Sequence, residues 1–195
     1  MLAFDEETHT YTWDGVEVPS VTQVLSPYSG LEFVDQDHLE ALARFGRHVH
    51  EAVHLHTQGS LEMDALDDHV RQYLDGWLKF LDDTGYVPTR SEARVYHPDI
   101  GYAGTLDSFG VIERKGVVTR ALIDIKTSLA PPRTVGPQTA AYVEAYKKTY
   151  PNETGRIYRY CCLLRPGSYA LCTLSDPMDL NVFLAALTMH RFIRR

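Results

Sequence analysis

A carboxylate and an amine two residues apart are the first groups in this sequence that could do chemistry together. Asp124 and Lys126 close the apolar stretch of residues 117–126, and on a β-strand they would point to the same side. Buried in a core, such charges cost roughly several kcal/mol unless they serve each other or a ligand. We therefore expect them at a strand end or over a cleft; the alternative is a surface ion pair at a fraying strand.

A third charged group, Asp107, stands on the preceding strand candidate. The turn of residues 114–116 predicts that the two strands pair as antiparallel neighbours, which puts Asp107 opposite residue 123 or 124. Two aspartates on one face would repel each other without a counter-ion, whereas a divalent cation bound by their oxygens removes the repulsion. With Lys126 alongside, the pattern indicates a divalent-cation site.

The composition places these residues in an ordinary globular protein. Of 195 residues, 44% are apolar and 23% charged, no apolar run is long enough to span a membrane, and the acidic start MLAFDEETHT lacks a secretory core. The formal charge of −7 argues against a protein that only coats nucleic acid, but not against an enzyme that grips it locally. Cys161, Cys162 and Cys172 predict neither a disulfide framework nor an iron–sulfur cluster, and a reducing, cytoplasmic compartment is expected.

Periodicity and turn signals predict one α/β domain with a mixed sheet. The expected order is a hairpin with a short helix, two long helices, three strands, a helix, a second hairpin and a closing helix. Their ranges are 10–18 with a helix capped by Ser20, 36–58, 62–83, 91–97, 102–113, 117–126, 137–149, 156–164 with 169–174, and from Ser175 to Arg194. The first long helix carries His50 one turn after Gly46, on a strip beside its apolar stripe.

Taken together, these segments resemble the PD-(D/E)XK nuclease superfamily, and within it the RecB-like branch with its phage exonucleases. The superfamily signature reads Asp107 and Asp124-Ile125-Lys126 here. The other motifs of the branch are matched, in the expected order within residues 40–165, by Gly46-Arg47-His48-Val49-His50, Gly104-Thr105-Leu106-Asp107 and Gln138-Thr139-Ala140-Ala141-Tyr142. The resemblance implies a restriction-endonuclease-like core, α-β-β-β-α-β, whose central mixed sheet is flanked by helices.

The resemblance also implies one nuclease domain over residues 1–195. Residues 1–35 would supply an N-terminal hairpin and short helix, residues 36–165 the nuclease core, and residues 166–195 a closing strand and helix. Within the first of these, Pro19-Ser20-Val21-Thr22 is similar to the start of phage-borne members.

The same resemblance implies a set of metal ligands. Asp107 would bridge or bind the metal, Asp124 would be a second carboxylate ligand, and the backbone carbonyl of Ile125 would add an oxygen. His50 would complete the site from the helix. The cofactor would be Mg²⁺ or Mn²⁺, as one or two ions, and an imidazole ligand suits Mn²⁺ better.

Four further residues receive roles in catalysis from the resemblance. Lys126 would hold or help deprotonate the attacking water and offset charge on the phosphate. Gln138 and Tyr142, one helical turn apart, would position the substrate backbone or brace Lys126. Glu92 matches a glutamate near the active centre of many relatives and is a candidate ligand for a second metal; the alternative is a solvated strand residue.

The function implied is a metal-dependent deoxyribonuclease, an exonuclease that hydrolyses phosphodiester bonds in DNA replication, recombination or repair. Its partners would be single-stranded DNA or duplex ends and a recombination or replication protein, with no membrane, in the cytoplasm of a bacterium or a phage-infected host. The resemblance does not fix an oligomeric state. Two alternatives are an inactive nucleic-acid-binding or assembly module on the same fold, and a metal hydrolase that is not a nuclease.

Residues that could contact DNA are scattered along the chain. The basic candidates for phosphate contacts are Arg44, Arg47, Arg90, Arg94, Arg114, Lys115, Lys147, Lys148, Arg156 and Arg159. Tyr96, Tyr102 and Tyr146 are candidates for stacking on unpaired bases. The remaining histidines of the first long helix, His48, His54 and His56, are expected on the surface, with phosphate contact as the alternative.

Overall fold

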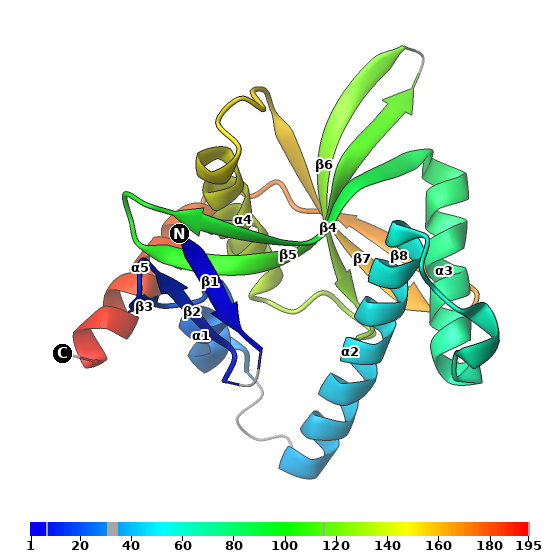
Figure 1. Ribbon diagram of the computed structural model, residues 1–195, viewed down its shortest axis with the longest axis horizontal. Coiled ribbons are helices and arrows are strands. Elements are labelled where there is room, and N and C mark those ends of the chain that lie inside the picture. The colour runs from blue at the N-terminus through cyan, green and yellow to red at the C-terminus, as the bar shows by residue number, and fades with distance from the viewer. Residues whose placement is uncertain (7, 31–34, 115, 195) are drawn as a thin grey trace.

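A five-stranded mixed sheet forms the centre of the computed structural model, which describes residues 1–6, 8–30, 35–114 and 116–194 (Figure 1). Its strands follow chain order: β4 (Tyr86–His97), β5 (Tyr102–Arg114), β6 (Val117–Lys126), β7 (Ile157–Arg165) and β8 (Ser168–Thr173). Neighbours are antiparallel except β6 and β7, which are parallel and joined through helix α4 (Val135–Thr149). The α/β class with a mixed central sheet is therefore confirmed.

Helices cover both faces of the sheet. Helices α2 (Gln36–Gln58) and α3 (Asp68–Thr84) share one hydrophobic cluster with the sheet, and α1 (Val21–Leu25), α4 and α5 (Asp179–Ile193) share another. Strand β6 divides its side chains between the two, with Leu122 in the α4 cluster and Ile123 and Ile125 in the α2–α3 cluster. Because alternate residues of a strand face opposite sides, this division bears out the predicted period of two.

A small antiparallel sheet precedes the first helix. It contains β1 (Leu2–Asp5), β2 (Thr10–Trp13) and β3 (Val16–Val18), so the hairpin predicted over residues 10–18 is confirmed and β1 extends it. Ser20 caps α1 as predicted, in a reciprocal capping box with Gln23. The small sheet contacts the central one where the hydroxyls of Tyr11 and Thr105 hydrogen-bond at 2.7 Å, two residues from Asp107.

The predicted starts of one helix and one strand shift. The helix predicted over 62–83 begins at Asp68, because Asp67 is its N-cap, and a 3-10 turn, η2 (Met63–Ala65), precedes it. A second such turn, η1 (Ser26–Tyr28), follows α1. The strand predicted from residue 91 begins at Tyr86, and its register shifts between Pro88 and Arg90. Helix α2 has its predicted bounds because Asp35 caps it and Gly59, at a left-handed φ of 71°, ends it.

In the part of the chain that the structure describes, no helix combines the length and apolar character that crossing a bilayer requires.

Candidate metal centre

The candidate residues meet where β5 parts from β6. Pairing of the two strands ends at Ser108 and Ile123, and Asp107 is the next residue of β5. Its Oδ2 accepts the backbone N–H of Ile125 at 2.6 Å, while Nε2 of His50 lies 3.0 Å from the Ile125 carbonyl oxygen. The side chains of Asp107 and His50 thus contact the N–H and the carbonyl of Ile125. These backbone groups would pair with β5 if the ladder of the two strands continued.

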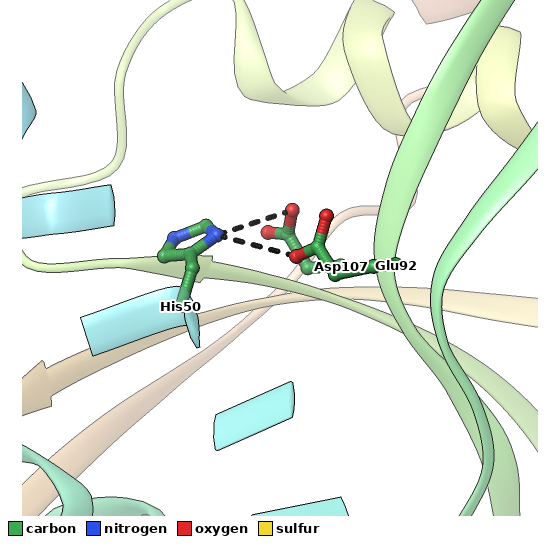
Figure 2. A group of neighbouring side chains, drawn as sticks. All are labelled: His50, Glu92 and Asp107. Carbon is green, nitrogen blue, oxygen red and sulfur yellow. Dashed lines mark ion pairs between the residues drawn. The ribbon is translucent and has the colours of Figure 1, made fainter. Parts of the chain in front are cut away.

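A potential metal-ligand group lies where β5 and β6 separate. His50 of α2, Glu92 of β4 and Asp107 of β5 offer ligand atoms that all lie within 4.8 Å of one another. Nδ1 of His50 is 3.5 Å from Oδ1 of Asp107 and 3.9 Å from Oε1 of Glu92, and Figure 2 shows both carboxylates turned toward that ring nitrogen. Because Nε2 is directed at a carbonyl, a neutral ring carries its proton there and leaves the lone pair of Nδ1 for a cation.

An unusual backbone conformation presents Glu92. It lies between the paired positions Ser91–Ser108 and Ala93–Leu106, opposite Asp107, with φ at 50° inside a strand. A non-glycine residue in this region costs on the order of 1 kcal/mol or more, and such strain gathers at functional sites. The conformation places Glu92 beside Asp107, and the two carboxylates repel each other unless a cation neutralises them.

Asp124 and Lys126 form an ion pair beside this group. Nζ of Lys126 is 2.6 Å from Oδ2 of Asp124, and the Asp124 side chain is 1% exposed. Neither oxygen of Asp124 accepts a well-aligned hydrogen bond from any described residue. Burial, reinforced by the Asp107 charge, outweighs the attraction of Lys126 and raises the pKa of Asp124 to about 6.

The other charges of the site also perturb one another. Burial and the neighbouring Asp107 raise the pKa of Glu92 to about 7. Burial favours the neutral forms of His50 and Asp107, yet their mutual attraction outweighs it, so the pKa of His50 is raised and that of Asp107 is lowered. Burial likewise disfavours the ammonium of Lys126, but the Asp124 and Asp107 carboxylates raise its pKa and hold it protonated. Three carboxylates crowded into one site are what a divalent cation would neutralise.

Gln138 and Tyr142 lie on α4. The amide of Gln138 donates to the Tyr142 hydroxyl at 3.3 Å, and the Tyr142 side chain is buried. A Cβ added at Gly104 would come within 2.5 Å of the Tyr142 ring, so the tyrosine packs directly against the β5 backbone three residues before Asp107. Burial, with the Asp107 charge, raises the Tyr142 pKa. Of the two roles expected from the sequence, this burial favours bracing the site over contacting substrate.

The structure therefore brings the charged candidates together where the β5–β6 pairing ends but divides them into two neighbouring groups. Glu92 joins His50 and Asp107 as the potential ligands. Asp124 lies beside them, paired with Lys126, and is outside the three-residue group. The Ile125 carbonyl, expected as a ligand, lies against His50.

The tyrosines proposed to stack on bases are a wrong prediction. Tyr96, Tyr102 and Tyr146 are all buried, the Tyr102 hydroxyl donates to the Ala141 carbonyl, and the Tyr146 ring stacks on Phe109. A tyrosine whose hydroxyl is hydrogen-bonded packs like an apolar side chain, and Tyr96 stacks on Trp13, so these three are part of the packed interior.

The basic candidates for phosphate contacts differ in availability. Five of them pair with acidic side chains of this chain: Arg90 with Glu153, Arg94 with Glu6, Lys147 with Glu144, Lys148 with Asp99 and Arg159 with Asp179. Arg44 and Arg47, both exposed on α2 near His50, and exposed Arg156 remain the better candidates. Lys115 lies outside the described residues.

His54 has a role that its sequence position did not reveal. Its Nδ1 lies 2.5 Å from the Ser91 hydroxyl and its Nε2 2.8 Å from the Gln58 amide nitrogen. Because an amide N–H can only donate, Nδ1 carries the ring proton and donates to Ser91, the neighbour of Glu92. The surface position expected for His54 is replaced by a link between α2 and the strained part of β4, whereas His48 is exposed as expected.

Replacing His54 with alanine is expected to weaken Mn²⁺ binding about tenfold, because supporting hydrogen bonds that orient ligands contribute on this scale. Isothermal titration calorimetry measures the effect, and His48→Ala on the same helix is the control that should bind as the wild type does. Equal affinities in His54→Ala and wild type would show that the Ser91 link does not position Glu92.

Comparison with known proteins adds no assignment: no known family model matches this chain, and no curated protein matches it.

Proposed function

We propose that this protein is a metal-dependent nuclease of the PD-(D/E)XK type, with a restriction-endonuclease-like core of the RecB-like kind. The observation that carries the proposal is the meeting of His50 with Glu92 and Asp107 beside the Asp124–Lys126 ion pair. The sequence of elements around it, α2, then β4 to β6, then α4 and β7, supports the same proposal.

The donor set fits a hard divalent cation. Two carboxylates and one imidazole suit Mn²⁺ or Mg²⁺, and His50 already directs its second nitrogen to a carbonyl as ligating histidines do. When bound, such an ion would act as a Lewis acid on a phosphate oxygen. His50, Glu92 and Asp107 would hold it, and the carboxylate of Asp124 lies close enough to Asp107 to raise the total negative charge that attracts it.

Besides the cation, the site has a positive charge of the protein itself, the ammonium of Lys126. Since the carboxylates keep it protonated, it serves as a donor that holds a water molecule and offsets charge on the phosphate, rather than as the base. Its side chain is 23% exposed, whereas that of Asp124 is 1% exposed, so the ammonium is the member of the pair that a substrate can reach. Asp124 then positions Lys126 through their ion pair.

The substrate we propose is DNA, as single strands or duplex ends, in replication, recombination or repair within a bacterial or phage-infected cytoplasm. Arg44 and Arg47 support a phosphate-binding role, because both are exposed on the helix that carries His50. Contacts of this kind hold nucleic acid locally despite a net charge of −7.

The test is cleavage of end-labelled single-stranded and duplex DNA with Mg²⁺, with Mn²⁺ or with EDTA. We expect turnover with Mn²⁺ and with Mg²⁺, faster with Mn²⁺ because of the imidazole ligand, and none in EDTA. Time courses separate stepwise shortening from internal cuts. Binding of DNA without turnover in either metal would instead indicate the inactive binding module, and neither binding nor turnover would overturn the proposal for DNA.

A further inference from the structure

Helix α5 is apolar on two opposite sides, and only one of them is covered. Phe183, Ala186 and Leu187 are buried in the cluster shared with α1 and α4. The other side exposes large apolar side chains at the edge of the molecule, where Figure 1 places this helix and the C-terminal end. They include Met178 (55% exposed), Val182 (51%), Met189 (47%) and Phe192 (68%). A surface helix with a polar outer face would not carry them.

The exposed residues follow a regular heptad spacing. Met178, Val182, Ala185, Met189 and Phe192 are separated by four, three, four and three residues, and all are exposed. This is the spacing of the two core positions of a coiled coil, in which each side chain packs between residues of a facing helix. Between residues 180 and 190 the exposed face includes Asn181 and Thr188 but no charged side chain. The stripe is therefore suited to packing against another helix.

Contacts at both ends hold this face rigid. Near the start of the helix, Asp179 pairs with Arg159 at 2.9 Å, with both side chains 13% exposed. Near the end, the Arg191 guanidinium donates to the carbonyl oxygens of Ile100 and Gly101. A preorganised helix loses little conformational entropy when a partner covers it.

We propose that the partner is a second copy of this chain, with the two α5 helices antiparallel about a two-fold axis at Ala185. The stripe is self-complementary about that residue, as an isologous interface requires. The small Ala185 faces its own copy at the crossing point, Val182 faces Met189, and Met178 faces Phe192 at the ends. Small residues at the centre and large ones at the ends let two such helices approach closely.

Charge supports the antiparallel arrangement over the parallel one. Asp176, before the helix, and Arg194, after it, are both exposed and lie equally far along the chain from Ala185. An antiparallel pair brings Asp176 of each copy to Arg194 of the other, and opposes the two helix dipoles favourably. A parallel pair would instead bring like charges together.

The size of the contact sets its strength. A helix of 15 residues is about 22 Å long, so the pair buries less than the roughly 800 Å² per partner of a standard stable interface. We therefore expect a dimer that dissociates in the micromolar range.

Sedimentation velocity from low micromolar to submillimolar protein tests the proposal without reference to any enzymatic activity. The wild type should shift from monomer to dimer, and Val182→Glu and Met189→Glu should stay monomeric. Leu42→Glu is the matched control, because Leu42 is a helical side chain of similar exposure, 52%, on α2, and it should dimerise as the wild type does. Circular dichroism checks that each variant is folded.

Charge reversal tests the orientation. Arg194→Asp and Asp176→Arg should each weaken the dimer severalfold, and the double variant should recover it. The proposal is wrong if the wild type remains monomeric at all concentrations, or if Val182→Glu and Met189→Glu leave the dimer intact. The antiparallel arrangement is wrong if the double variant does not recover the dimer.

Discussion

Asp107→Asn is expected to lower kcat for DNA cleavage by at least about a thousandfold, since it removes the charge of one of the three proposed metal ligands. Asparagine has nearly the shape of aspartate, and its amide oxygen can still accept the Ile125 N–H that Asp107 now accepts at 2.6 Å. The fold should therefore persist while the cation is lost. Single-turnover cleavage with Mn²⁺ measures the rate, and calorimetric Mn²⁺ titration measures binding.

The control for Asp107→Asn is Glu113→Gln, an exposed carboxylate on the same strand, which should leave both measurements unchanged. A variant that keeps Mn²⁺ affinity and cleavage would show that Asp107 is a structural acceptor for Ile125 and no more. If cleavage disappears but Mn²⁺ still binds, the ion is held elsewhere, with Asp124 as the next ligand to replace.

Much of the site could be predicted because its residues lie on regular elements. The turn after β5 determined that Asp107 would approach residue 123 or 124, and pairing that ends at Ser108 and Ile123 places it there. The bounds of β6 and α2 also agree with prediction. In each case an apolar period was interrupted by a glycine or turn, which is the signal that sequence carries most clearly.

What could not be predicted depends on departures from regular structure. Glu92 reaches the metal-ligand group from a backbone with φ at 50°, beyond a register shift near Pro88, and neither feature follows from residue types. His54 acts through Ser91, 37 residues away in the chain. The error over Tyr146 has a different cause: its hydroxyl donates to Glu153 at 2.6 Å, and a polar group satisfied inside the protein cannot be distinguished in sequence from one that waits for a ligand.

Lys126→Ala is expected to destabilise the metal-free protein by about 3 kcal/mol and to slow cleavage at least about a hundredfold. Removing the amine leaves the buried Asp124 carboxylate without its counter-charge, next to Asp107. Asp124→Asn should destabilise the protein less, because the Lys126 ammonium that it leaves behind is 23% exposed and still lies near Asp107. The neutral amide removes a carboxylate whose burial raises its pKa to about 6, and this gain offsets part of the lost attraction for Lys126.

Urea unfolding in EDTA gives the order of stabilities, which we expect to be Lys126→Ala below Asp124→Asn and Asp124→Asn below wild type. The double variant should recover most of what Lys126→Ala loses, since no buried carboxylate is then left unpaired at residue 124. Lys79→Ala is the control: its partner Asp83 is exposed, and the loss should be much smaller than that of Lys126→Ala. If Lys126→Ala is as mild as Lys79→Ala, the Asp124 carboxylate does not depend on the amine, and the crowding of charge that supports the proposed cation site is absent.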